Sequence, residues 1–188
     1  VSAIAARAAS YWVRDVRYRV SIISIPVTPI VLVLVLGVAG APADLLALLP
    51  VPVIALFLGW NLHDDVAFDS TAFWLHVASN VKGRADRLGR IVPALAIGVP
   101  VVLLGSVVSA WLHGDWAVLG SILGVSLFTL LWGLGLSSVM SAAFPYPVVR
   151  PGDNPFTQPQ SGGGLTALLQ SLTFLGTLIA ALPVIALA

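Results

Sequence analysis

The sequence contains no cysteine and few charged residues. Of its 188 residues only 9% are charged, whereas 59% are hydrophobic. A soluble domain carries about 25% charged residues, so this chain cannot cover a globular surface, and lipid is the natural solvent for the rest. The absence of cysteine excludes a disulfide framework and a thiolate metal site.

Lysine occurs once, as Lys82, and is followed by Gly83. A Walker A loop needs Gly-Lys followed by Ser or Thr, so this chain has no such loop. We therefore predict that the chain is not an enzyme and holds no cofactor, and that any ATP hydrolysis takes place elsewhere. No standard metal-ligand spacing is found in the densest group of candidate ligands, which comprises His63, Asp64, Asp65, Asp69 and His76.

Five long apolar stretches dominate the chain. A transmembrane helix needs roughly 20 mostly apolar residues, and these stretches are apolar all round rather than amphipathic, which argues against a soluble core. We predict an all-α fold: one polytopic integral membrane helical bundle of about five transmembrane helices. The predicted spans cover residues 20–39, 45–62, 91–112, 116–143 and 165–188. Because the chain begins at Val1 and ends on apolar residues, we expect a fragment of a larger protein.

The basic residues set the predicted orientation. All nine fall in residues 1–19, 63–90 and 144–164, whereas the connections 40–44 and 113–115 have none. By the positive-inside rule, these three loops and the N-terminus are expected on the cytoplasmic side of a bacterial inner membrane. The basic residues follow the membrane edge, which gives no support for nucleic-acid binding. They are Arg7, Arg14, Arg17, Arg19, Lys82, Arg84, Arg87, Arg90 and Arg150.

No Asp, Glu, Lys, Arg or His lies inside a predicted span. Ion-coupled carriers usually keep an ionisable residue at membrane depth. Its absence argues against a proton-coupled secondary transporter and against a charge-selective pore. The remaining possibilities are a transport pathway for apolar or amphipathic cargo, or a pathway built by residues of another chain or segment.

Aromatic residues gather at the ends of the spans. Trp111 and Trp116 bracket the turn after the third span, and Tyr11, Trp12 and Tyr18 precede the first. Both groups are typical of interfacial aromatic belts. For Trp12, packing against neighbouring residues is an equal alternative.

The fourth span carries small residues at four-residue spacing. They are Gly120 and Gly124, followed by Gly133, Ser137 and Ser141. Such rows let two helices approach closely. We predict a helix-packing face, used either within the subunit or against a partner.

The loop 63–90 carries a predicted amphipathic helix over residues 71–81. Asp69 and Ser70 can cap its start, and Gly83 would break it. Asp86 and Arg90 follow at i, i+4 spacing, where an exposed pair contributes only a few tenths of a kcal/mol. The apolar stripe of the helix comprises Phe73, Trp74, Val77, Ala78 and Val81. The helix either rests on the lipid headgroups or couples the bundle to another protein.

The loop 144–164 differs, because residues 145–164 hold five Pro and four Gly. This composition excludes a regular helix. The Ser-Gly-Gly-Gly run at 161–164 is typical of a flexible hinge. The loop is either a solvated linker or a docking strip for a partner.

Three runs resemble the ATP-binding-cassette type-2 exporter permeases. They are Phe-Asp-Ser-Thr-Ala-Phe-Trp-Leu at 68–75, Gly-Arg-Ala-Asp-Arg-Leu-Gly-Arg at 83–90 and the basic segment 11–19. The chain departs from that family at Ser70, where Gly is common, and at Arg90, where Lys is common. The resemblance covers about a third of the chain.

The resemblance implies a permease that forms the pathway beside a second permease half or copy. A separate ATPase subunit, carrying ATP and Mg²⁺, would bind the cytoplasmic side through residues 63–90. The implied interface comprises Phe68, Asp69, Thr71, Phe73, Trp74, Leu75, His76, Arg84, Asp86, Arg87 and Arg90. The alternatives are a scaffold or anchor subunit that transports nothing, and a lipid-active enzyme or small-molecule carrier.

Overall fold

The computed structural model describes residues 1–150, 152–154, 157 and 164–188, apart from the side chain of residue 166. Within these residues the chain forms helices and no strand. In chain order they are α1 (Ser2–Arg14), α2 (Val16–Val38), α3 (Ala43–Leu48), α4 (Pro50–Trp60), α5 (Asp65–Phe68), η1 (Ser70–Phe73), α6 (Trp74–Ala78), α7 (Gly83–His113), η2 (Trp116–Val118), α8 (Leu119–Ala143) and α9 (Gly164–Leu187).

Five helical segments of the described chain are long and apolar enough to cross a membrane. They are Val16–Val38, Ala43–Trp60, Gly83–His113, Trp116–Ala143 and Ala167–Leu187. The predicted all-helical bundle with five such helices is therefore confirmed at this level. The second consists of α3 and α4, which meet where proline takes the first position of α4, a position that tolerates the missing N–H.

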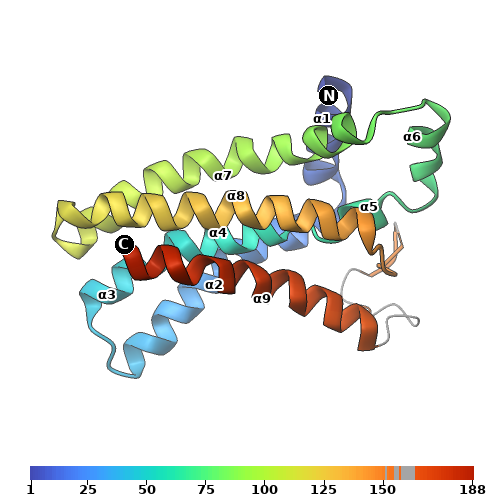
Figure 1. Ribbon diagram of the computed structural model, residues 1–188. Helices are drawn as coiled ribbons and strands as arrows, with labels where there is room; N and C mark the ends of the chain where they lie inside the picture. The colour runs from blue at the N-terminus through green and yellow to red at the C-terminus, as the bar shows by residue number, and fades with distance from the viewer. Residues whose placement is uncertain (151, 155–156, 158–163) are drawn as a thin grey trace.

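The helices pack around a central pair, α4 and α8 (Figure 1). α7 and α9 also pack against α8, and α2 packs against α4. Gly59 of α4 and Gly133 of α8 meet at the crossing, where a Cβ added to either glycine would lie 3.1 Å from the other's Cα. The absence of side chains is therefore what allows the central helices to approach so closely.

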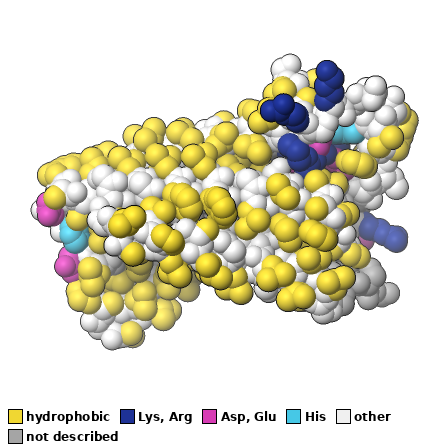
Figure 2. Space-filling model, in the orientation of Figure 1, with side chains coloured by type: hydrophobic (Ala, Val, Ile, Leu, Met, Phe, Trp, Pro, Cys, Tyr) yellow, Lys and Arg dark blue, Asp and Glu magenta, His cyan; other side chains and the backbone are white. Residues whose placement is uncertain are grey.

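The outer surface divides into three zones along the bundle (Figure 2). On the face shown, hydrophobic side chains cover the middle, Lys and Arg gather at one end together with Asp and His, and Asp and His without Lys or Arg lie at the other. We call the end where Lys and Arg gather the basic end. The N-terminus and the starts of α7 and α9 lie there (Figure 1). Side chains such as Leu34, Leu104 and Val139 are largely exposed. A long apolar girdle between two polar ends is typical of a helical membrane protein.

Residues 1–19 are not a loop, as the sequence analysis predicted, but mostly helix. α1 packs against the start of α7, with Ala8 and Trp12 buried. Trp12 stacks on Tyr18, with ring centroids 6.2 Å apart, so packing rather than an interfacial belt accounts for it. Asp15 separates α1 from α2, and its carboxylate accepts a 2.9 Å hydrogen bond from the Arg17 N–H as a helix N-cap.

Candidate functional site

A buried ion-pair cluster lies at the basic end, centred on Arg90 in the second turn of α7. Arg90 Nη1 donates to Asp65 Oδ2 at 2.7 Å, and its Nε donates to Asp86 Oδ1 at 3.0 Å. The remaining nitrogen, Nη2, pairs with Asp69. One guanidinium thus joins the start of α7 to α5 and to the residue after it.

The cluster extends to α1, α2 and α6. Arg7 of α1 pairs with the second oxygen of Asp69, and the Tyr18 hydroxyl of α2 donates to Asp65. His76 of α6 also contacts Arg7. Through these contacts five helices and the intervening turns are tied to one group of charges.

Three carboxylates, those of Asp65, Asp69 and Asp86, face three guanidinium groups in this cluster. Arg87 supplies the third, donating from Nε to Asp86 at 3.0 Å. The formal charges therefore balance without counting histidine. Balance and dense hydrogen bonding are what make a buried cluster of charges tolerable.

The sequence analysis was wrong about the Asp86–Arg90 pair, which it placed on an exposed surface. Asp86 is 6% and Arg90 5% exposed. The i, i+4 spacing put the two residues on one helix face, as expected. It did not show that α1 and the turn at Asp65 and Asp69 cover that face.

The predicted helix over 71–81 is also not continuous. It forms η1 and α6, which end at Ala78. Neither Asp69 nor Ser70 caps it: Asp69 is engaged by the two arginines, and η1 has no side-chain cap. Ser70 and Asn80 both have φ of 48°, a region that residues other than glycine rarely adopt. Ser70 bends the chain at the start of η1, and Asn80 bends it just after α6. Gly83 begins α7 instead of breaking a helix.

Residues 70–78, which we call the apolar segment, turn large hydrophobic side chains outward. Trp74 is 62% and Val77 68% exposed, and Phe73 and Leu75 are also exposed. The side chain nearest the cluster is a polar one: His76 Nδ1 lies 2.8 Å from Asp86 Oδ1. The apolar segment thus exposes its hydrophobic side chains, while its inner side contacts the ion-pair cluster through His76.

The residues of the predicted interface fall into three sets: those in or against the cluster, those at its margin, and those that are exposed. Asp69, Asp86 and Arg90 are buried in the ion-pair cluster, and Phe68 stacks edge-on against Tyr18 at 5.0 Å. Arg87 and His76 lie at its margin. The exposed members are Thr71, Phe73, Trp74, Leu75 and Arg84.

The two rows of small residues on α8 also differ. Gly133 and Ser137 face α4, and Ser141 Oγ accepts a 2.9 Å hydrogen bond from the N–H of Val66 in α5. A Cβ at Gly120 or Gly124 would meet no atom within 4 Å. Only the second row therefore packs within the described chain.

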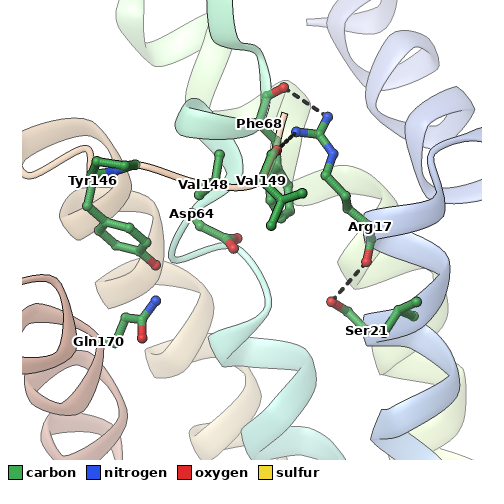
Figure 3. A pocket seen from close by; sticks show the side chains of 10 residues that line it. Arg17, Ser21, Asp64, Phe68, Tyr146, Val148, Val149 and Gln170 are labelled. Carbon is green, nitrogen blue, oxygen red and sulfur yellow. Dashed lines mark hydrogen bonds between the residues drawn. The ribbon is translucent and has the colours of Figure 1, made fainter. Parts of the chain in front are cut away.

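A second polar site, which the sequence analysis missed, lies between α2, the turn after α4, the segment after α8, and α9. It is a cavity of about 230 Å³ whose polar lining includes Arg17, Asp64, Tyr146 and Gln170 (Figure 3). Arg17 donates to the carbonyl oxygens of Phe68 at 3.1 Å and Val149 at 2.8 Å. The hydroxyl of Tyr146 is buried and has no hydrogen-bond partner among the described residues.

This cavity borders the loop 144–164. Residues 144–150 run along it without regular secondary structure, as the proline content predicted. Residues 161–163 of the predicted hinge lie outside the described residues. The sequence placed Asp64 only among candidate metal ligands and did not connect it with Tyr146, because about 80 residues separate two side chains that the fold brings to one cavity.

Burial raises the pKa of Asp64, whose side chain is only 17% exposed, although nearby His63 opposes the effect. Asp65 adds to the rise, and Arg17 works against it. Burial and the Asp64 carboxylate likewise raise the pKa of Tyr146. For Asp15, partial burial would raise the pKa, but the hydrogen bonds from Arg17 outweigh it and lower the pKa.

The raised pKa of Asp64 predicts a pH-dependent effect of Asp64→Asn. Because the pKa of Asp64 is higher in the folded state than in the unfolded state, the folded state binds the proton more tightly, and this carboxyl contributes less stability as the pH rises from about 4 through its folded pKa. We expect Asp64→Asn to raise the melting temperature at pH 7.5 but not near pH 4. One kcal/mol corresponds to about 2–4 °C in a chain of this size, and the rise should be of that order.

Intrinsic fluorescence during heating measures this effect. Asp153→Asn removes an exposed carboxylate from the loop after α8 and should leave the melting temperature unchanged at both pH values. An equal shift for Asp64→Asn at pH 4 and pH 7.5 would show that its protonation is not responsible.

No group of three or more His or Asp side chains that could hold a metal ion occurs in the part of the chain that the structure describes. Comparisons with protein-family models, curated proteins and solved structures find no match for this chain.

Proposed function

We propose that the chain is the membrane-spanning permease part of an ATP-driven bacterial exporter. The apolar segment would be its contact with a separate ATPase subunit. The supporting observation is that the apolar segment exposes four large hydrophobic side chains directly beside a cluster of buried ion pairs. These side chains are Phe73, Trp74, Leu75 and Val77. Exposed apolar patches with polar rims mark interaction sites, and tryptophan is a frequent anchor of protein interfaces.

The ion-pair cluster gives this contact a way to act on the bundle. Asp69 immediately precedes η1 and pairs with both Arg7 of α1 and Arg90 of α7. From the other side of the segment, His76 meets Asp86. A displacement of the apolar segment would therefore be passed to α1 and α7 through charge-assisted contacts, which are short and directional.

The charge distribution supports the proposed orientation. With the basic end in the cytoplasm, the positive-inside rule is satisfied by all nine basic residues. The predicted spans hold no ionisable side chain at membrane depth, which favours apolar or amphipathic cargo. A second copy of the chain, or another permease half, would complete the pathway.

Replacing Trp74 with alanine tests the proposal in the intact transporter. A central tryptophan is worth about 2 kcal/mol or more at an interface, so the affinity for the ATPase subunit should fall about 30-fold. Trp116→Ala is the matched control, because Trp116 is equally exposed at the opposite end. Titrating purified permease with the ATPase subunit, while following ATP hydrolysis, measures both variants.

Two results would contradict the exporter. One is that no ATPase is recovered with the permease in mild detergent. The other is that Trp74→Ala and Trp116→Ala behave alike. The scaffold alternative instead predicts that Trp74→Ala releases a partner that hydrolyses no ATP.

A further inference from the structure

We propose that the cavity beside Asp64 binds a small primary ammonium group, from either a free amine or a phospholipid headgroup. This site is separate from the apolar segment and does not require an ATPase subunit. Three polar side chains converge on the cavity in Figure 3: Asp64 lies centrally, and Tyr146 and Gln170 point toward one another beside it. They come from three separate parts of the chain.

The Tyr146 hydroxyl is the strongest sign of a ligand. The residue is only 9% exposed, and its oxygen makes no hydrogen bond of ordinary geometry among the described residues, although the Gln170 side chain lies close enough to oppose the rise in its pKa. A buried hydroxyl without a hydrogen bond destabilises the fold, because it has lost its contact with water and gained none in return. A donor placed between this oxygen and the Asp64 carboxylate would remove that cost.

Charge determines what the donor should be. Arg17, the cation that lines the cavity, is already committed to Asp15, Phe68 and Val149. The nearest other cation candidate, His63, has its Nδ1 4.0 Å from Asp64 and 2.7 Å from the Trp60 carbonyl oxygen. The Asp64 carboxylate is therefore the group left to be neutralised, and the site suits a cation.

The remaining lining favours a primary ammonium over a bare metal ion. Its N–H bonds can be accepted by the Asp64 carboxylate and the Tyr146 oxygen, while Gln170 turns its amide nitrogen toward Tyr146 (Figure 3). The aromatic ring of Tyr146 adds a surface on which an organic cation is attracted. Among the described residues that line the cavity, Asp64 is the single carboxylate. Hard divalent cations prefer a shell of several oxygen ligands, including more than one carboxylate.

Size and position limit the ligand further. The cavity of about 230 Å³ is smaller than the roughly 300–1,000 Å³ of sites for drug-sized molecules. It lies at the basic end, between the first two turns of α2 and the second turn of α9, where lipid headgroups would lie. An ethanolamine-sized group fits both facts, either free or as the headgroup of phosphatidylethanolamine.

Binding of ethanolamine and of phosphatidylethanolamine tests the proposal in two arms. In the first arm, the intact protein in phosphatidylglycerol nanodiscs is titrated with radiolabelled ethanolamine. In the second, native mass spectrometry counts phosphatidylethanolamine retained from mixed nanodiscs. Saturable binding in the first arm identifies a free amine as the source, and retention in the second alone identifies a lipid headgroup.

Substitutions locate the site. Asp64→Asn should weaken binding about 10- to 100-fold and Tyr146→Phe about 3- to 10-fold, because a charged contact contributes more than a neutral hydrogen bond. Asp153→Asn, the exposed control, should bind as wild type does. Choline, which has no N–H to donate, should bind more weakly than ethanolamine.

The proposal is overturned if neither probe binds, or if Asp64→Asn and Asp153→Asn bind alike. Equal affinity for choline and ethanolamine would overturn the hydrogen-bonded primary ammonium. Melting curves of each variant keep these outcomes separate from misfolding. None of them depends on ATP hydrolysis, so this site and the exporter proposal can fail independently.

Discussion

Replacing Arg90 with methionine is expected to lower the melting temperature by about 10 °C. The substitution leaves the carboxylates of Asp65, Asp69 and Asp86 without their shared cation at the centre of the cluster. Removing one partner of a buried ion pair costs about 3–5 kcal/mol, and each kcal/mol corresponds to about 2–4 °C here. Thermal unfolding of the purified protein in detergent measures the loss.

Arg84→Met is the matched control. Arg84 lies on the same helix, six residues earlier, but is exposed, so its loss should change the melting temperature by no more than about 1 °C. Arg90→Lys should fall between the two, because lysine keeps the charge but not the forked geometry that reaches three carboxylates. If Arg90→Met has the same melting temperature as the wild type, the cluster does not hold these helices together.

Replacing Gly133 with leucine should separate the central helices. An added Cβ would lie 3.1 Å from Gly59 Cα and 3.3 Å from its carbonyl carbon, and backbone atoms cannot turn aside as a flexible side chain can. Overpacking costs about 1–3 kcal/mol. We expect the upper end of that range, a fall of about 6–12 °C, in the same unfolding measurement.

Gly135→Leu is the control on the same helix. A Cβ at Gly135 meets no atom within 4 Å, so leucine should be accommodated on the outer surface. Gly133→Ala should cost less than Gly133→Leu, since only the Cβ has to fit. Equal losses at positions 133 and 135 would contradict the close crossing as the cause.

The five long apolar helices could be predicted from the sequence because they depend on local runs of residues. Length and uniform apolarity are enough to define each of the five helices, and most boundaries needed only small shifts. The largest shift is at α7, which begins at Gly83 rather than at residue 91. Charged residues at 84–90 seemed to belong to a loop, but their partners allow them to lie inside a helix.

The ion-pair cluster could not be predicted in the same way. Arg7, Tyr18, Asp65 and Arg90 come from four separate stretches, and no local pattern says that they meet. For α1 a signal did exist: Ala8 and Trp12 are spaced as one buried helix face requires. The two small-residue rows of α8 look alike in sequence, and only the position of α4 distinguishes Gly133 from Gly120.

The cluster also determines when this protein can finish folding during synthesis. Arg7 leaves the ribosome about 80 residues ahead of Arg90, which at roughly 5–20 residues per second is a delay of several seconds. Until then Asp65 and Asp69 lack their main cation, and α1 has no α7 against which to bury Trp12. The first two long helices are therefore made before their charged end can be closed. The emergence of α7 closes that end, and α8 then supplies the central helix against which α4 packs.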